Sequence, residues 1–227
     1  MTQELTKPIN LNNPKSAQVE QENPFETSKV KRKLNTKDCR ILFLYPNERG
    51  MSTIPPSITA LSQILKDEGH QTALFDTTFY KFDDEITIED SDAITQKALT
   101  NRPVLDIDDD DLHFKKTTRS AVIDFEKSIE EFMPDFIAVS CTETTFLRAM
   151  KLIDQTRHKN IKNIFGGVFP TFAPELVMNY KNVDMLCIGE GENSIIDLAN
   201  SISNGEDYAN ATNLWIRQKD GTIKKNS

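Results

Sequence analysis

Two glycine-containing loops near the C-terminal end constrain the fold of this chain most. The first, at 165–171, reads FGGVFPT, and the second, at 188–192, reads IGEGE. Each follows a short apolar run and precedes a helix-like pattern, as at the carboxyl ends of strands in a parallel α/β sheet, where such folds bind ligands. Glycine lets the chain turn with positive φ and lets a ligand approach the backbone closely. The two loops therefore predict a ligand site on an α/β domain.

Apolar runs alternate with helical patterns from residue 40 onward, and this alternation predicts the fold class. Continuous apolar runs are typical of parallel strands buried on both faces. A continuous apolar run occurs at 41–45, and further strand-like segments occur at 71–75, 136–139, 161–165 and 183–188. We therefore expect an α/β fold that is flavodoxin-like (Rossmann-like), with a doubly wound sheet of five parallel strands in the order 2-1-3-4-5. A C-terminal β-hairpin is predicted from 213–218 and 222–225, joined at Asp220-Gly221.

The chain of 227 residues divides into three predicted parts. Residues 1–37 are polar with almost no apolar periodicity, so we expect a disordered or loosely ordered N-terminal extension. Residues 38–212 are expected to form the α/β domain, interrupted by an acidic insertion at 77–116. Residues 213–227 are expected to hold the terminal hairpin and the start of a linker.

Composition excludes several classes of partner. A net charge of −8 argues against a nucleic-acid surface, which needs clustered Lys and Arg. No apolar run approaches the length of a transmembrane helix, and the first residues lack a signal-peptide core, so a cytoplasmic protein without a membrane partner is expected. Cys39, Cys141 and Cys187 are widely spaced, and we expect no metal site. His70 and His158 lie near helix ends, where exposed positions are expected.

Three stretches, taken in order along the chain, resemble one known family. The opening is 40–46, followed by Ile54-Pro55-Pro56 and a helix that ends at 68–70. The middle is 134–140, a Thr-rich turn, and Gly166-Gly167-x-x-Pro170-Thr171 with Pro174-Glu175. The end is Val183-Asp184, the loop at 189–192 and a hairpin around Trp215. From about residue 40 to residue 225, the chain resembles the N-terminal cobalamin-binding domain of cobalamin-dependent radical SAM enzymes.

The resemblance implies a corrin ring lying flat across the strand ends, with its nucleotide tail in a groove of the sheet. Hydroxyl groups after the third strand and open backbone at the glycine loops would contact the cofactor, and the turn at 47–51 would face the cobalt. The implied cofactor-binding residues are Pro46, Asn47, Glu48, Arg49, Gly50, Met51, Ser140, Thr142, Glu143, Thr144, Gly166, Gly167, Val168, Phe169, Pro170, Gly189, Glu190, Gly191 and Glu192. No residue of this chain is expected to be catalytic.

Some of these residues also have a purely structural interpretation. Glu143, Glu190 and Glu192 lie at predicted helix starts, where carboxylates ordinarily stabilise the helix dipole. Phe165, Phe169 and Phe172 would each either wall a ring-shaped ligand or pack under the loop, and for Phe169 we favour the wall.

Two departures from family patterns shape the functional expectation. Cobalamin domains of the methionine synthase type carry Asp-x-His-x-x-Gly after the first strand, whereas this chain has Asn47-Glu48-Arg49-Gly50-Met51-Ser52. The resemblance therefore implies base-off cobalamin without a histidine ligand. In the family, a domain with Cys-x-x-x-Cys-x-x-Cys binds a [4Fe–4S] cluster and S-adenosylmethionine (SAM), and this chain contains no such motif.

We expect this chain to be a fragment or a split subunit. It would serve methyl transfer or a radical rearrangement together with a radical SAM catalytic domain, in cis or in trans. The alternative is a non-catalytic protein-interaction module that kept the fold without binding cobalamin.

Overall fold

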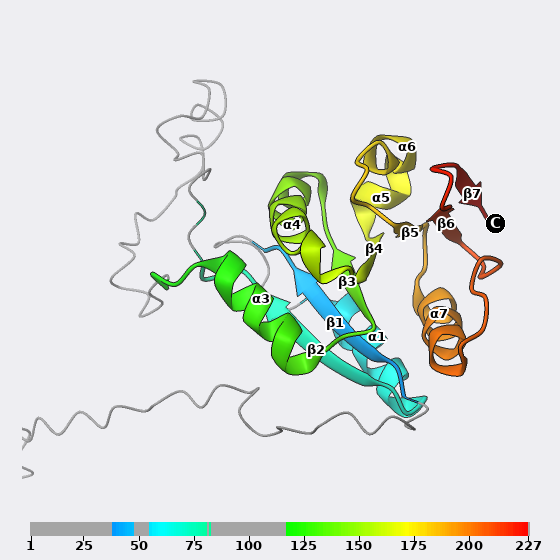
Figure 1. Cartoon of the computed structure of the whole chain (residues 1–227), viewed down its shortest axis with the longest axis horizontal. Helices are drawn as coiled ribbons and strands as arrows, with labels where there is room; N and C mark the ends of the chain where they lie inside the picture. The colour runs from blue at the N-terminus through cyan, green and yellow to red at the C-terminus, as the bar shows by residue number, and fades with distance from the viewer. Residues whose placement is uncertain (1–37, 48–54, 81, 83–116, 227) are drawn as a thin grey trace, which may run out of the picture.

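The computed structural model describes residues 38–47, 55–80, 82 and 117–226 and shows one sheet with helices on both faces (Figure 1). The strand order is β2-β1-β3-β4-β5-β6-β7. The strands are β1 (Arg40–Tyr45), β2 (Gln71–Asp76), β3 (Phe136–Ser140), β4 (Lys162–Gly166), β5 (Met185–Cys187), β6 (Leu214–Arg217) and β7 (Ile223–Lys225). Strands β1 to β5 pair in parallel, which confirms the predicted order 2-1-3-4-5. The predicted hairpin, β6–β7, continues the same sheet in antiparallel pairing and makes it mixed.

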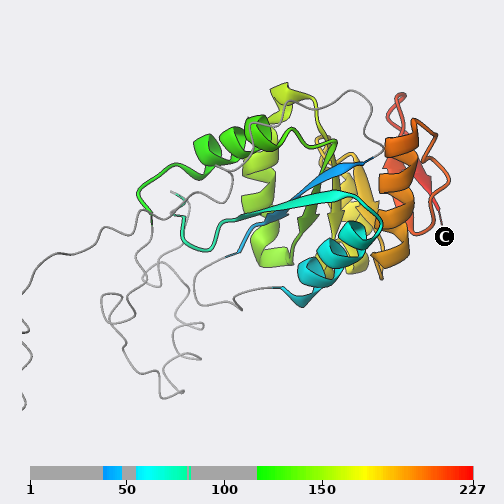
Figure 2. The ribbon, with the colours of Figure 1, turned by 90° about the horizontal axis from the view of Figure 1, so that it is seen from below.

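The helices divide between the two faces of the sheet (Figure 2). They are α1 (Pro56–Asp67), α3 (Ala121–Phe132), α4 (Glu143–Gln155), the short 3-10 helix η1 (Arg157–Lys159), α5 (Val168–Phe172), α6 (Pro174–Met178) and α7 (Glu192–Asn204). Helices α3, α4 and α6 bury one core, which contains Leu42 and Leu44. Helices α1 and α7 bury the other, which contains Ile41 and Phe43. Alternate residues of each strand thus enter opposite cores, as the pleat requires.

Local details of the fold include the turn after β4 and the surroundings of two histidines. Two short helices, α5 and α6, follow β4. The chain enters α5 directly from Gly167, whose φ of 102° permits the abrupt turn. His70, expected to be exposed, is 6% exposed, and its Nδ1 accepts a hydrogen bond from the Cys39 amide at 3.1 Å. His158 is exposed, as expected.

Tyr80, near the start of the predicted insertion at 77–116, lies beside Thr117, which directly follows the insertion. Tyr80 and Thr117 form a parallel bridge. The Tyr80 hydroxyl donates to Asp124 on α3 at 2.8 Å, and burial, followed by this hydrogen bond, raises the pKa of Tyr80 to about 12. Most of the stretch at 77–116 and all of 1–37 lie outside the described residues. In the part of the chain that is described, no helix is long and apolar enough to cross a membrane.

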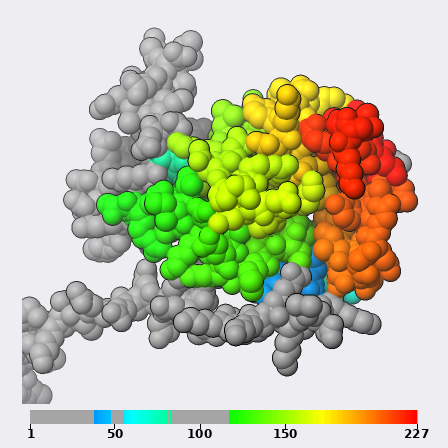
Figure 3. Space-filling model, viewed as in Figure 1, coloured from blue at the N-terminus to red at the C-terminus, as the bar shows by residue number. Residues whose placement is uncertain are grey.

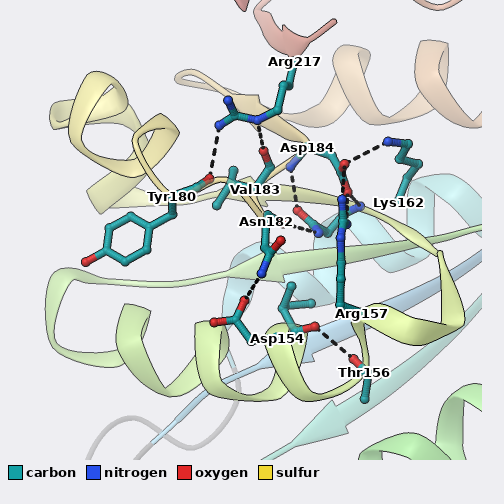
Figure 4. A network of polar contacts seen from close by, with 11 residues as sticks. Asp154, Thr156, Arg157, Lys162, Tyr180, Asn182, Val183, Asp184 and Arg217 are labelled. Carbon is teal, nitrogen blue, oxygen red and sulfur yellow. Dashed lines mark hydrogen bonds and ion pairs between the residues drawn. The ribbon is translucent and has the colours of Figure 1, made fainter. Parts of the chain in front are cut away.

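A polar network joins the amino-terminal ends of β4 and β5 to the hairpin (Figure 4). The buried Asp184 carboxylate accepts hydrogen bonds from the two terminal guanidinium nitrogens of Arg157, at 2.9 and 3.2 Å. It accepts another from Lys162 Nζ, at 2.9 Å. It also accepts the Asn163 amide at 3.1 Å. Arg217 from β6 donates to the carbonyls of Val183 and Tyr180. These contacts hold the hairpin beside α6 and α7, as the space-filling view also shows (Figure 3).

The charge balance at Asp184 predicts a pH-dependent stability. Burial pushes the pKa of Asp184 up, but hydrogen bonds and charge from Arg157 and Lys162 outweigh it, so the pKa is lowered overall. A carboxylate with a lowered folded-state pKa stabilises the fold above its unfolded pKa of about 3.9, and this contribution disappears as pH falls through the folded-state pKa.

We predict that Asp184→Asn lowers the free energy of unfolding by about 2 kcal/mol at pH 7, the scale of hydrogen bonds to a charged group. The loss stays below that of a fully buried ion pair because Arg157 and Lys162 are partly exposed and rehydrate. Urea unfolding at several pH values measures the difference, which narrows as the pH falls below about 3.9. Asp154→Asn, in the exposed part of the same network, is the control. An undiminished difference at low pH would contradict this account.

Candidate functional site

A cavity of about 510 Å³ opens where β1, β3, β4 and β5 end. It lies on the face of the sheet that α1 and α7 cover, because its lining includes Leu61 of α1 and Ile195 of α7. Its deep walls are apolar, whereas its mouth carries hydroxyls and carboxylates. The deep residues are Phe43, Leu61, Ala138, Ile164 and Ile195, and the polar residues are Asn47, Ser57, Ser140, Thr142, Thr145, Thr171, Glu190 and Glu192.

The end of β4 leaves open space because two glycines follow one another. Gly166 pairs with Ser140 of β3 and lines the cavity. A Cβ on Gly166 would meet only Cys187 Cβ, at 3.8 Å, so a side chain there would extend into the cavity. Gly167 is different, because a Cβ on it would lie 2.8 Å from the backbone oxygen of Cys141. The first glycine therefore shapes the space, and the second permits the turn.

Thr171 of α5 joins the two glycine loops. Its hydroxyl donates to the Gly167 carbonyl at 2.8 Å and accepts the Gly189 amide at 3.1 Å. Gly189 itself has a φ of 76°, in the region that favours glycine. One short side chain thus fixes the separation of the loops after β4 and β5. This explains why a threonine stands four residues after Gly167 in the motif.

Helix α7 begins at the mouth of the cavity without a side-chain cap. Its N-cap residue is Gly191, which lines the cavity, and Glu192 follows in the first turn. The first-turn amides of a helix have no partners within the helix, and they favour hydrogen-bond acceptors. Glu190 and Glu192 are exposed at the same rim, where they can accept hydrogen bonds from amide groups of a ligand.

The Thr-rich turn after β3 caps α4, and only some of its residues line the cavity. Thr142 is the N-cap residue, and its amide donates to Thr145 Oγ1 at 3.1 Å. Thr142 and Thr145 line the cavity, whereas Glu143 and Thr144 are exposed and do not. Glu143 lies in the first turn of α4, where a carboxylate stabilises the helix dipole.

Two cysteines and one tyrosine on the cavity wall have raised pKa values. Burial raises the pKa of the Cys141 thiol to about 12, and burial likewise raises the pKa of Cys187. The pKa of Tyr45 is raised by burial and by the charge of Asp76. Thiols in this state are poor nucleophiles and poor metal ligands. Within the described ranges, no group of three or more His, Cys, Asp or Glu side chains could hold a metal ion.

The structure brings many of the sequence-predicted residues to one cavity. Those that line it are Asn47, Ser140, Thr142, Gly166, Gly167, Val168, Gly189, Glu190, Gly191 and Glu192. Those described but outside the lining are Pro46, Glu143, Thr144, Phe169 and Pro170. Glu48, Arg49, Gly50 and Met51 lie outside the described residues.

Two phenylalanines of α5 take opposite positions. The ring of Phe169 packs edge-on against Phe146, with centroids 5.2 Å apart, and contributes to the core under α4. Phe172 lines the cavity and is 84% exposed. Of these two candidates, Phe172 and not the favoured Phe169 lines the cavity.

The deep apolar walls were not identified from the sequence. Phe43, Ala138 and Ile164 were assigned to strands buried on both faces, without a distinction between the faces. The alternation of side chains along a strand could have predicted these walls, because Ala138 and Gly166 are small and lie on the same face of adjacent strands. Small residues clustered on one face leave room there that helices on that face do not fill.

The two glycines predict different responses to alanine. Gly167→Ala should lower the free energy of unfolding by at least about 2 kcal/mol, because its φ of 102° and ψ of −165° are essentially restricted to glycine. Its new Cβ would also press on the Cys141 carbonyl. Gly166→Ala should change stability by less than about 0.5 kcal/mol, as a substitution without strain does. Urea unfolding of both variants measures this, and equal losses would contradict the geometry.

Comparison with known proteins identifies the family of this domain. A family model described as the B12 binding domain matches residues 47–199, which is more than half of the chain. No curated protein matches. Among solved structures, the chain is similar to the radical S-adenosylmethionine methyltransferase TsrM from Kitasatospora setae with tryptophan substrate and a SAM analogue bound. The identity is 19% over 82% of this chain and 30% of that chain, with a TM-score of 0.59.

Two further structures show the same fold. TsrM from Kitasatospora setae with cobalamin and a [4Fe-4S] cluster bound is 17% identical over 83% of this chain and 29% of that chain, with a TM-score of 0.57. Apo, selenomethionine-labelled OxsB, a cobalamin-dependent S-adenosylmethionine radical enzyme, is 15% identical over 83% of this chain and 22% of that chain, with a TM-score of 0.52. The chain thus spans less than a third of each of these enzymes. By its sequence match and its fold, this chain belongs to the B12 binding domain family.

Proposed function

We propose that this chain holds cobalamin, with the corrin ring across the mouth of the cavity and the nucleotide tail in its deep apolar part. The observation that carries this proposal is the space left by Gly166 and Ala138 between the sheet and helices α1 and α7. A cavity of about 510 Å³ has the size of a small-molecule site. Its apolar walls suit a flat aromatic base, and its polar mouth suits a ring that carries carboxamides.

The rim of the cavity contains both the hydrogen-bond donors and the hydrogen-bond acceptors that the carboxamides of a corrin ring would need. Backbone amides at the start of α7 would donate to carboxamide oxygens, and Glu190 and Glu192 would accept from carboxamide nitrogens. Val168 and Phe172 are 62% and 84% exposed and form an apolar shelf beside Gly167. Such exposed apolar groups at a cavity mouth favour contact with an apolar ring edge.

Bound cobalamin supplies a cobalt centre for methyl transfer or a radical rearrangement. The residues of this chain would bind and orient it, while SAM and a [4Fe–4S] cluster would belong to a radical SAM catalytic domain in cis or in trans. Among the described residues, no histidine lines the cavity. We therefore propose that the cofactor is bound base-off without a histidine ligand, and that the chain alone performs no reaction.

Gly166→Leu tests the proposed tail site. The leucine side chain would extend into the cavity, so the dissociation constant for hydroxocobalamin should rise at least about tenfold, equivalent to 1.4 kcal/mol. Gly166→Ala should give a smaller increase. Equilibrium titration in the visible spectrum, followed by desalting, measures retention of the cofactor.

Titration of the same Gly166 variants with cobinamide, which lacks the nucleotide tail, is the internal control. The dissociation constant for cobinamide should change little in Gly166→Leu, since the corrin ring would lie at the mouth of the cavity. Circular dichroism and thermal melting establish that the variant folds. A folded Gly166→Leu variant that retains cobalamin like the parent would reject the tail site. A parent chain that retains no cobalamin would favour the interaction-module alternative.

A second prediction concerns the apolar shelf. Phe172→Ser should raise the dissociation constants of cobalamin and cobinamide alike by about tenfold, since loss of an aromatic contact of roughly 1–2 kcal/mol affects the ring in both. Leu176→Ser is the matched control, because Leu176 is 53% exposed on α6 and does not line the cavity. Equal effects of the two substitutions would show that Phe172 has no specific contact with the ligand.

A further inference from the structure

A buried arginine from α4 reaches the end of β1, where this strand meets the cavity. Arg148 is 9% exposed, and its guanidinium donates to the backbone carbonyl of Asn47 at 2.9 Å. The two residues are separated by 101 positions in the sequence. Burying a guanidinium costs desolvation energy, so such a group is placed where its hydrogen bonds offset that cost. Here the guanidinium donates to a residue of the cavity lining.

Asn47 is held from several directions. Its carbonyl also accepts the Thr77 hydroxyl at 2.9 Å, and its side-chain amide donates to Thr78 Oγ1 at 2.9 Å. The backbone amides of Asn47 and Thr77 both donate to the Tyr45 carbonyl, at 2.9 and 3.1 Å. Thr78 is in turn held by Asp76. The ends of β1 and β2 therefore form one polar junction, which Arg148 completes from the neighbouring helix.

The same guanidinium also contacts the start of the acidic stretch. Arg148 lies over the ring of Phe82, with Cζ 4.5 Å from its centroid, and Lys151 Nζ lies 5.9 Å from that centroid. Phe82 packs against the core under α4. A cation over an aromatic face is attractive, and burial strengthens this attraction. Arg148 thus bridges the end of β1 and the segment that follows β2.

We infer that Arg148 is a positioning residue for the ligand site: it fixes Asn47 at the cavity wall and ties that wall to the Phe82 segment. This inference rests on the proposed function, because its consequence is measured as cobalamin affinity. Arg148 does not line the cavity and acts through Asn47. Without it, the Asn47 carbonyl loses its charged donor, and the end of β1 becomes less constrained.

Arg148→Met should raise the dissociation constants of cobalamin and cobinamide by about tenfold. Arg148→Lys keeps the positive charge but has no planar fork of donors, so an intermediate effect is expected. Arg157→Met is the matched control. Arg157 also makes close polar contacts, but at the opposite ends of the strands, with Asp184. The Arg157→Met substitution should lower the thermal midpoint of unfolding. At a temperature where the variant is folded, it should leave the dissociation constants of cobalamin and cobinamide unchanged.

Hydrogen exchange on the ligand-free protein gives a readout independent of cobalamin. The amides of Asn47 and Thr77 should exchange about tenfold faster in Arg148→Met, while in Arg157→Met they should not. A tenfold faster exchange corresponds to the same loss of local free energy as a tenfold rise in the dissociation constant. If Arg148→Met does not fold, the comparison is made with Arg148→Lys.

Unchanged affinity and exchange in the Arg148 variants, with a parent chain that binds cobalamin, would overturn the inference alone. The same holds if Arg157→Met weakens binding equally. A parent chain that binds no cobalamin overturns the proposed function, and with it the ligand part of the inference, whereas faster exchange in Arg148→Met would still support the junction itself.

Discussion

The close approach of Gly167 to β3 is the constraint on which the site depends. A Cβ on Gly167 would lie 2.8 Å from the Cys141 carbonyl oxygen, so no side chain fits, and its φ of 102° turns the chain from β4 straight into α5. This turn places Thr171 where it bridges Gly167 and Gly189. The loops after β4 and β5 are thereby held as one unit. The mouth of the cavity is shaped by backbone geometry at these two loops.

The two faces of the sheet differ at the carboxyl ends of the strands, and this difference creates the cavity. On the α4 side, the large rings of Phe165 and Phe146 pack with centroids 5.6 Å apart in the buried core. On the α1 and α7 side, Ala138, Gly166 and Cys187 are small, and the helices do not close over them. Close packing of protein interiors makes such an unfilled apolar space unusual unless a ligand occupies it. Both faces of the sheet thus carry a buried core, but only the face under α1 and α7 leaves a cavity at the strand ends.

Much of the fold could be predicted from the sequence, since apolar runs and glycine punctuation depend on local chemistry. The order of the five parallel strands and the terminal hairpin were predicted correctly. The deep walls of the site were not, because a run such as 41–45 is apolar on both faces and does not tell which face a helix will cover. The burial of His70 and the role of Arg148 also escaped, since their partners, Cys39 and Asn47, are distant in sequence. Long-range hydrogen bonds leave no periodic signal in a single sequence.

The most direct test of the central claim is a titration of the unmodified chain with hydroxocobalamin, followed through the visible spectrum and then by desalting. The account predicts retention of one equivalent with a base-off spectrum, and tighter binding of cobalamin than of cobinamide because only cobalamin fills the deep cavity. Loss of all colour on desalting, or equal affinity for both corrinoids, would contradict it.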